Sequence, residues 1–304
     1  MVSRFIALVF PFILLIAFGP ANSDTTTTDR FEKGQSTVVI AHRSASMEGQ
    51  PENSLGWISR AIEHGVDMVH INPQKTADGH YVLMHDQTLN RMTDVESVFP
   101  DGPPNGPTRA QRGGKDYVGD YTLKEIRRLR LVEDAEGNTQ PVPTLGEAIE
   151  LVDGRALILL GLKSYEIESM AQALKGHATD NLLFFELFFS GTDQSKLRDL
   201  VDATGVPTAV TLFRTRDASD DLDEVAEQLG PRLKLVMTDS KQLSAEFVRY
   251  ANELGLRVTV SGWDGREDYA LVHESDPAPW LSVIENGHSA TTDHPRLLLD
   301  AIGR

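Results

Sequence analysis

The chain has 304 residues, of which 40% are hydrophobic and 24% charged, a composition typical of a globular protein with a full core. Its 45 acidic residues outnumber the 29 lysines and arginines and give a formal net charge of −16. Because a nucleic-acid backbone needs a basic surface, this charge argues against a nucleic-acid partner. The absence of cysteine excludes disulfides, thiolate catalysis and cysteine-ligated zinc.

The N-terminus has the pattern of a secretory signal peptide. Arg4 precedes an apolar run over residues 5–18, and small residues follow it. The run is shorter than the ~20 residues that a membrane-spanning helix needs. We therefore predict a signal peptide over 1–23, a polar linker over 24–36, and a secreted or periplasmic protein with no stable membrane span after cleavage. An uncleaved anchor is the alternative.

From residue 37 onward, short β-branched runs alternate with amphipathic segments, as in repeated βα units on a parallel sheet. Strands are predicted at 38–41, 67–72, 81–84, 156–161, 182–187, 208–212, 233–237, 257–260 and 289–292. Helices are predicted at 54–64, 122–129, 144–152, 166–177, 192–204, 220–229, 244–254 and 294–302. This pattern indicates an α/β fold, a (β/α)8 TIM barrel with one hairpin-like extra strand, in a single domain over 37–304. An open, doubly wound sheet is the alternative, although no glycine-rich phosphate turn follows the first strand.

Segment 93–120 interrupts this alternation with a concentration of prolines and glycines. A loop of this length in a compact domain is usually functional or mobile, and a surface insertion without a role is the alternative. We expect no second core in the chain.

Charged and titratable side chains follow several of the predicted strands. Since catalytic side chains of a parallel βα barrel lie at the carboxyl ends of its strands, these residues are expected to share one mouth. Two histidines there can act as general base and general acid, and Arg43 and Lys163 can hold phosphate oxygens. This chemistry predicts phosphoryl transfer from a small-molecule phosphodiester. The residues at the strand ends are His42, Arg43, His70, Asn72, His85 and Lys163.

Three other residues near the predicted mouth have more than one interpretation. Trp263 either covers a headgroup or packs beside Gly262. Glu186 either orients a histidine or binds a polyol inside the pocket, or else lies on the surface. Asp293 lies at the end of the last strand, where it also suits the N-cap of the final helix.

Short motifs, in order along most of the chain, are similar to those of the glycerophosphodiester phosphodiesterase family. The resemblance implies a (β/α)8 barrel of the phospholipase C-like phosphodiesterase type that acts on glycerophosphodiesters or phospholipid-derived headgroups. The motifs are Ile40-Ala41-His42-Arg43, Pro51-Glu52-Asn53-Ser54, Gly65-Val66-Asp67-Met68, Asp78-Gly79, His85-Asp86-Gln87-Thr88-Leu89-Asn90-Arg91, Pro143-Thr144-Leu145 and Thr292-Asp293-His294-Pro295.

The resemblance also implies roles for individual residues. His42 matches the family's base-like histidine and His85 its acid-like histidine. Arg43 matches the family's arginine, and the Glu52-Asn53 pair matches its Glu-Asn pair, which places both residues in the pocket.

The family's divalent metal is a separate question. The family has a Glu-x-Asp pair at the end of its second strand and the first residue of a Glu-x-Lys motif as ligands, and this chain has His70, Asn72 and Gly161 there, with Lys163 retained. Because Mg²⁺ and Ca²⁺ prefer anionic oxygen ligands, we do not carry the family's metal onto this chain and assign no metal ligand. The cofactor stays open.

Three hypotheses follow. In the first, the protein is a metal-free phosphodiesterase in which Arg43, Lys163 and a protonated His70 neutralise the phosphate. In the second, His42, His70 and His85 bind Zn²⁺. In the third, the chain is a catalytically inactive relative that binds a phosphorylated ligand or acts as an interaction module. In an enzyme, the nucleophile is water or a neighbouring hydroxyl of the substrate.

Overall fold

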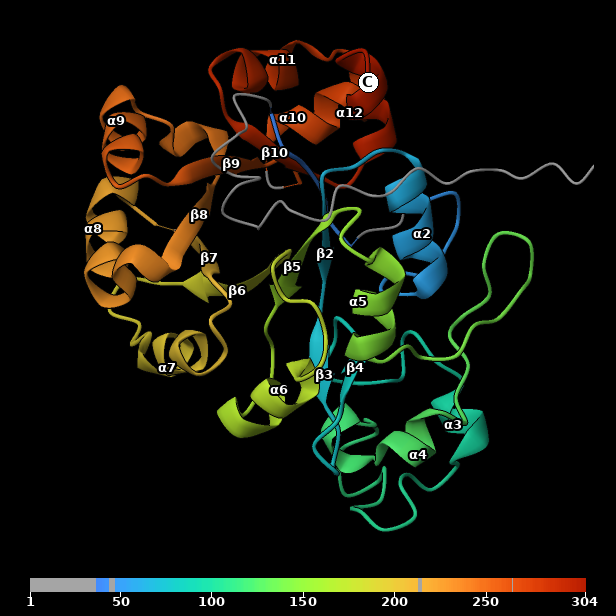
Figure 1. The fold of residues 1–304 in the computed structure, drawn as a ribbon. Coiled ribbons are helices and arrows are strands. Elements are labelled where there is room, and N and C mark those ends of the chain that lie inside the picture. Colours follow the sequence, from blue (N-terminus) through green and yellow to red (C-terminus); the bar gives the residue numbers. More distant parts are fainter. Residues whose placement is uncertain (1–36, 44–46, 213–214, 264) are drawn as a thin grey trace, which may run out of the picture.

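The computed structural model describes residues 37–304 apart from 44–46, 213–214 and 264 (Figure 1). The predicted signal peptide over 1–23 and linker over 24–36 lie outside the described residues. In the part of the chain that is described, no helix is long and apolar enough to cross a bilayer.

The main sheet is parallel and closes on itself in the order β1-β10-β9-β8-β7-β6-β5-β2. Its strands are β1 (Val39–Ala41), β2 (Met68–Ile71), β5 (Leu157–Gly161), β6 (Leu182–Phe188), β7 (Thr208–Leu212), β8 (Leu233–Thr238), β9 (Arg257–Ser261) and β10 (Ser289–Thr292). Nearly every strand residue is buried, because one face of each strand lines the barrel interior and the other packs on helices. The predicted (β/α)8 barrel is confirmed, and the open sheet is excluded.

A hairpin outside the barrel leads the chain to its rim. β3 (Pro73–Lys75) comes soon after β2 and pairs antiparallel with β4 (Tyr81–Leu83), which is the predicted extra strand. The sequence did not indicate β3, because a Pro-Gln-Lys run has low strand propensity. The backbone N–H of Met84 donates to the carbonyl of Asn72 (2.9 Å), so the hairpin ends at the barrel rim, one residue before His85.

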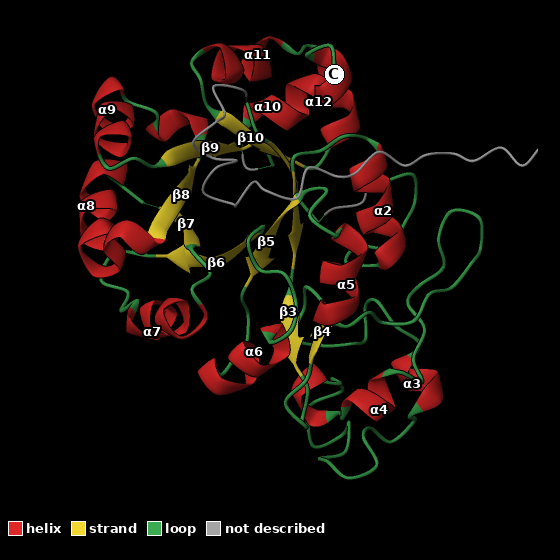
Figure 2. Ribbon diagram, in the orientation of Figure 1, coloured by secondary structure: helices red, strands yellow, loops and turns green. Residues whose placement is uncertain are grey.

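Helices surround the barrel (Figure 2). They are α2 (Leu55–Glu63), α3 (Val95–Val98), α4 (Leu123–Ile126), α5 (Leu145–Val152), α6 (Ile167–Leu174), α7 (Ser195–Thr204), α8 (Ala218–Leu229), α9 (Ala245–Glu253), α10 (Arg266–Tyr269), α11 (Ala278–Glu285) and α12 (Pro295–Ala301). All the predicted helices are present. The sequence missed α3 and α10, which are about one turn long, and α11, which lies among prolines at Pro277 and Pro279.

A second hydrophobic cluster is formed by residues 82–142, the stretch of sequence from β4 to just before α5, which contains segment 93–120. Phe99 and Tyr121 are among its buried side chains, and α3 and α4 lie to the lower right of the hairpin in the view of Figure 1. The hydroxyl of Tyr121 donates to Asp116, which also accepts from Arg109 (2.6 Å each). The sequence did not predict this cluster, because apolar residues scattered over irregular sequence meet only in three dimensions. The predicted domain limits stay a prediction.

Candidate active site

A cavity of about 530 Å³ opens where the carboxyl ends of the barrel strands meet. The predicted site residues that line it are His42, Arg43, His70, His85, Lys163 and Trp263. Glu186 and Asp293 line it as well, so Glu186 lies in the cavity wall rather than on the outer surface. Glu52, Asn53 and Asn72, which we expected in the pocket, lie behind the lining and contact other site residues.

The side chain of His42 is held between a carboxylate and an aromatic ring. Its Nδ1 lies 2.6 Å from Oδ1 of Asp293, and its ring stacks on Trp263 with centroids 4.1 Å apart. Because an ionised carboxylate only accepts, Nδ1 carries the proton of this hydrogen bond, and Nε2 of the neutral ring keeps a lone pair. This is the arrangement of a general base with its orienting carboxylate.

The N-cap hypothesis for Asp293 is wrong. His294 is the N-cap residue of α12, and its side chain makes no capping hydrogen bond. Instead, the backbone N–H of Asp293 donates to Oδ2 of the buried Asp268 (2.9 Å), whose Oδ1 accepts from Nε1 of Trp280 (3.0 Å). Asp268 thereby holds the end of β10 in place. Sequence analysis missed it, because Asp268 lies on α10 and no local pattern relates it to the mouth.

His85 is also paired with a carboxylate. Its Nδ1 lies 2.8 Å from Oδ1 of Asp86. Burial lowers the pKa of His85 below 6.5, and the hydrogen bond with Asp86 opposes this shift. Nε of Arg91 donates to Oδ2 of Asp86 (2.6 Å) and is the main reason that the pKa of Asp86 falls to about 2. Asp86 is therefore ionised at neutral pH.

Arg91 connects this pair to Arg43 through Glu52. Its Nη2 donates to Oε1 of Glu52 (2.5 Å), and Oε2 of Glu52 accepts from Nη1 of Arg43 (2.7 Å). Carboxylates and guanidinium groups thus alternate from His85 to Arg43, and each charge has a neighbour of opposite sign. The sequence showed Arg91 only as part of a motif, because its bridge to Glu52 depends on the fold.

His70 lines the cavity but is only 6% exposed. Burial lowers the pKa of His70 well below 6.5, and repulsion from neighbouring basic groups, among them Lys163 and Arg43, lowers it further. Burial and the surrounding charges therefore favour a neutral ring and argue against the hypothesis of a protonated His70. Arg43 and Lys163 are the fixed cations among the described cavity residues. Burial and the charge of Arg43 lower the pKa of Lys163 as well.

We expect His70 to make the folded chain less stable in acid. The unfolded chain binds a proton on His70 near pH 6.5 and the folded chain resists it, so the free energy of unfolding falls as the pH falls below 6.5. In His70→Gln this fall is smaller, by up to about 1.4 kcal/mol per pH unit. Thermal melts over this pH range measure the difference, with the exposed His80→Gln as control. An equal pH dependence in wild type and His70→Gln would contradict the prediction.

The model of the Glycerophosphoryl diester phosphodiesterase family matches residues 42–279. The chain belongs to this family. A glycerophosphodiester phosphodiesterase of Caldanaerobacter subterraneus is 35% identical over 133 residues, which are 42% of this chain and 46% of the relative. One of Haemophilus influenzae is 36% identical over 99 residues, which are 33% of this chain and 25% of the relative. The chain thus matches less than half the length of these curated relatives.

Solved structures share the fold of this family member. A glycerophosphoryl diester phosphodiesterase from Parabacteroides distasonis superposes with a TM-score of 0.66 at 21% identity, over 92% of each chain. An Oleispira antarctica phosphodiesterase in complex with the product sn-glycerol-3-phosphate superposes with a TM-score of 0.62 at 21% identity, over 88% of this chain and 97% of that one. At these identities the likeness establishes the fold.

Among the described residues of this family member, no three His, Cys, Asp or Glu side chains are placed to hold a metal ion. The structure therefore does not support the zinc hypothesis for His42, His70 and His85. Nδ1 of His42 and Nδ1 of His85 each bond to a carboxylate, and Nε2 of His70 lies 3.4 Å from the amide nitrogen of Asn72.

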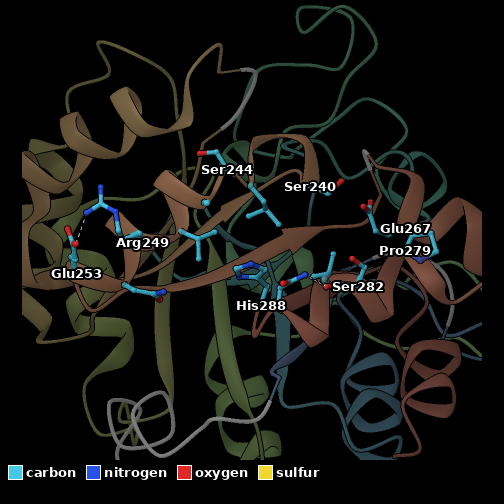
Figure 3. Close-up of a pocket in the computed structure, with 14 residues that line it drawn as sticks. Ser240, Ser244, Arg249, Glu253, Glu267, Pro279, Ser282 and His288 are labelled. Carbon is cyan, nitrogen blue, oxygen red and sulfur yellow. Dashed lines mark hydrogen bonds and ion pairs between the residues drawn. The ribbon is translucent and has the colours of Figure 1, made fainter.

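A second hollow of this family member, of about 1000 Å³, lies outside the barrel between α9 and α11 (Figure 3). Arg249 and Glu253 form an ion pair at one end (2.7 Å), and Glu267 lies at the other. His288, which is as buried as His70, lies between them and directly precedes β10. It is at the amino end of that strand, away from the mouth, so this hollow is separate from the candidate active site.

Proposed function

We propose that this chain is a phosphoric diester hydrolase that cleaves glycerophosphodiesters or phospholipid-derived headgroups by acid–base catalysis. The observation that carries the proposal is that two histidine–carboxylate pairs face one cavity together with Arg43 and Lys163. The signal-peptide pattern over 1–23 supports action outside the cytoplasm.

His42 acts as the base. Its Nε2 takes the proton of the nucleophile, which is water or a neighbouring substrate hydroxyl, as the nucleophile's oxygen bonds to phosphorus. The carboxylate of Asp293 opposes the positive charge that the ring gains. Nδ1 keeps its proton throughout, so the ring holds its orientation.

His85 acts as the acid. The protonated ring gives a proton to the leaving alkoxide as the bond between that oxygen and phosphorus breaks. The anionic phosphate of the bound substrate favours the protonated ring and so opposes the effect of burial on the pKa of His85. Arg43 and Lys163 stabilise the charge on the non-bridging phosphate oxygens.

The divalent ion that the resemblance implies does not fit the residues of this chain. The positions of its ligands carry His70, Asn72 and Gly161, which offer no carboxylate to a hard cation. A Cβ at Gly161 would lie 2.3 Å from Nε2 of His70 and 2.4 Å from Nδ2 of Asn72, so these two side chains fill the space of a third ligand. We therefore propose a divergent member that acts without the family's metal.

Turnover by the chain from Asp24 to Arg304 tests this proposal. The substrates are a panel of glycerophosphodiesters and a chromogenic diester, each with and without a chelator. We expect turnover that resists the chelator, is lost in His42→Ala and His85→Ala, and is kept in His80→Ala, whose side chain is exposed on the hairpin.

Two results would overturn parts of the proposal. Turnover that the chelator removes would show that an ion is bound after all. No turnover above that of the two histidine variants, with or without added divalent metals, would exclude the enzyme for these substrates. The catalytically inactive relative that binds a phosphorylated ligand would then be the better account.

A further inference from the structure

His70 has a buried polar atom that the proposed chemistry does not use. Among the described residues, no hydrogen-bond partner lies near its Nδ1, although His70 is only 6% exposed. An unsatisfied buried donor or acceptor is costly, and native structures keep few of them. The position of the ring proton decides whether Nδ1 donates or accepts a hydrogen bond.

The neighbouring amide determines where that proton lies. Nδ2 of Asn72 donates to the carbonyl oxygen of Gly161 (3.2 Å), which can only accept, and Nδ2 of Asn53 donates to Oδ1 of Asn72 (3.4 Å). The NH₂ group of Asn72 therefore faces Nε2 of His70, at 3.4 Å. Because an amide NH₂ only donates, Nε2 accepts, and the single proton of the neutral ring is on Nδ1.

The position of the ring shows which way this donor faces. Nε2 and Cδ2 of His70 lie 2.3 Å and 3.2 Å from the place where a Cβ of Gly161 would be. Nδ1 lies opposite the Nε2–Cδ2 bond in the ring, so it faces away from Gly161. The ring itself lines the cavity that also holds Arg43 and Lys163, and its centroid is 5.3 Å from that of His42.

We propose that Nδ1–H of His70 donates a hydrogen bond to an oxygen of the anionic group that binds in this cavity. The identity of that group as a phosphate rests on the proposed function. A neutral donor adds no charge that would repel His42 as it gains a proton, whereas a third fixed cation would. His70 is thus a phosphate-binding residue, and Asn72 is the positioning residue that sets its tautomer.

Binding of inorganic phosphate, measured by calorimetry on the chain from Asp24 to Arg304, tests this role. We expect His70→Phe, which keeps a ring but no donor, to bind phosphate about 10- to 100-fold more weakly. His70→Asn is expected to recover part of the loss and His70→Gln less, because the amide nitrogen of asparagine lies near the position of Nδ1 and that of glutamine near Nε2. The control is His288→Phe, the same change at an equally buried histidine in the hollow of Figure 3, which should bind as wild type does.

Nitrogen-15 NMR of the wild-type histidine rings keeps the test independent of how the variants fold. We expect His70 in its Nδ1–H tautomer, and a shift of that N–H resonance as phosphate is added. An Nε2–H tautomer, or equal phosphate affinity in wild type and His70→Phe, would overturn the inference. If the wild type cleaves diesters and His70→Phe binds phosphate with unchanged affinity, the inference about His70 fails and the proposed function stands. If phosphate binds through His70 but no diester is cleaved, the proposed function fails and the inference stands.

Discussion

His85→Ala is expected to lower kcat on a glycerophosphodiester about 100- to 10,000-fold and to slow a nitrophenyl diester much less. The alkoxide of an ordinary alcohol needs a proton as its bond to phosphorus breaks, and nitrophenolate leaves without one. His42→Ala is expected to slow both substrates to a similar extent, because the nucleophile must lose its proton whatever the leaving group is. The two histidines are therefore separable by the choice of substrate.

Steady-state kinetics on both substrates measure this separation. His80→Ala is the matched control, since it removes an exposed histidine from the hairpin that leads to His85. Equal losses on the two substrates in His85→Ala would contradict its role as the acid. If His42→Ala lowers kcat on the glycerophosphodiester but not on the nitrophenyl diester, His42 is the acid and the two histidines exchange roles.

Asp293→Asn is expected to lower kcat about 100-fold or more with little change in thermal stability. The carboxylate lies 2.6 Å from Nδ1 of His42, and the proposed base gains a positive charge that only an ionised partner opposes. An asparagine keeps the size of the side chain and loses the charge. Because Asp293 is partly exposed, the fold does not depend on burying it.

The matched control is Asp300→Asn on α12, where the carboxylate forms an exposed ion pair with Arg296. Such pairs contribute little, so its kinetics should equal those of wild type. Kinetics within about twofold of wild type in Asp293→Asn would show that this carboxylate does not assist the base, and Asp268, which holds the backbone of Asp293, would then have a structural role only.

The sequence by itself determined the architecture of this protein. Runs of β-branched residues and helical periodicity are local signals, so the barrel strands and most helices followed from the pattern. The mouth followed as well, because parallel strands in a closed barrel end at one rim and bring the residues after them together. This is how His42 and Lys163 were predicted to share a cavity, whereas His85 reaches the rim because the hairpin outside the barrel ends there.

Only the tertiary structure decided the chemistry of individual groups. His42 and Asp293 are 251 positions apart in sequence, and no pattern predicts that their side chains meet. The charge of His70 depends on burial, and its proton depends on how Gly161 and Asn53 orient an amide. Protonation states and hydrogen-bond partners arise from distances between remote segments and from the solvent that packing removes, which a linear sequence does not contain.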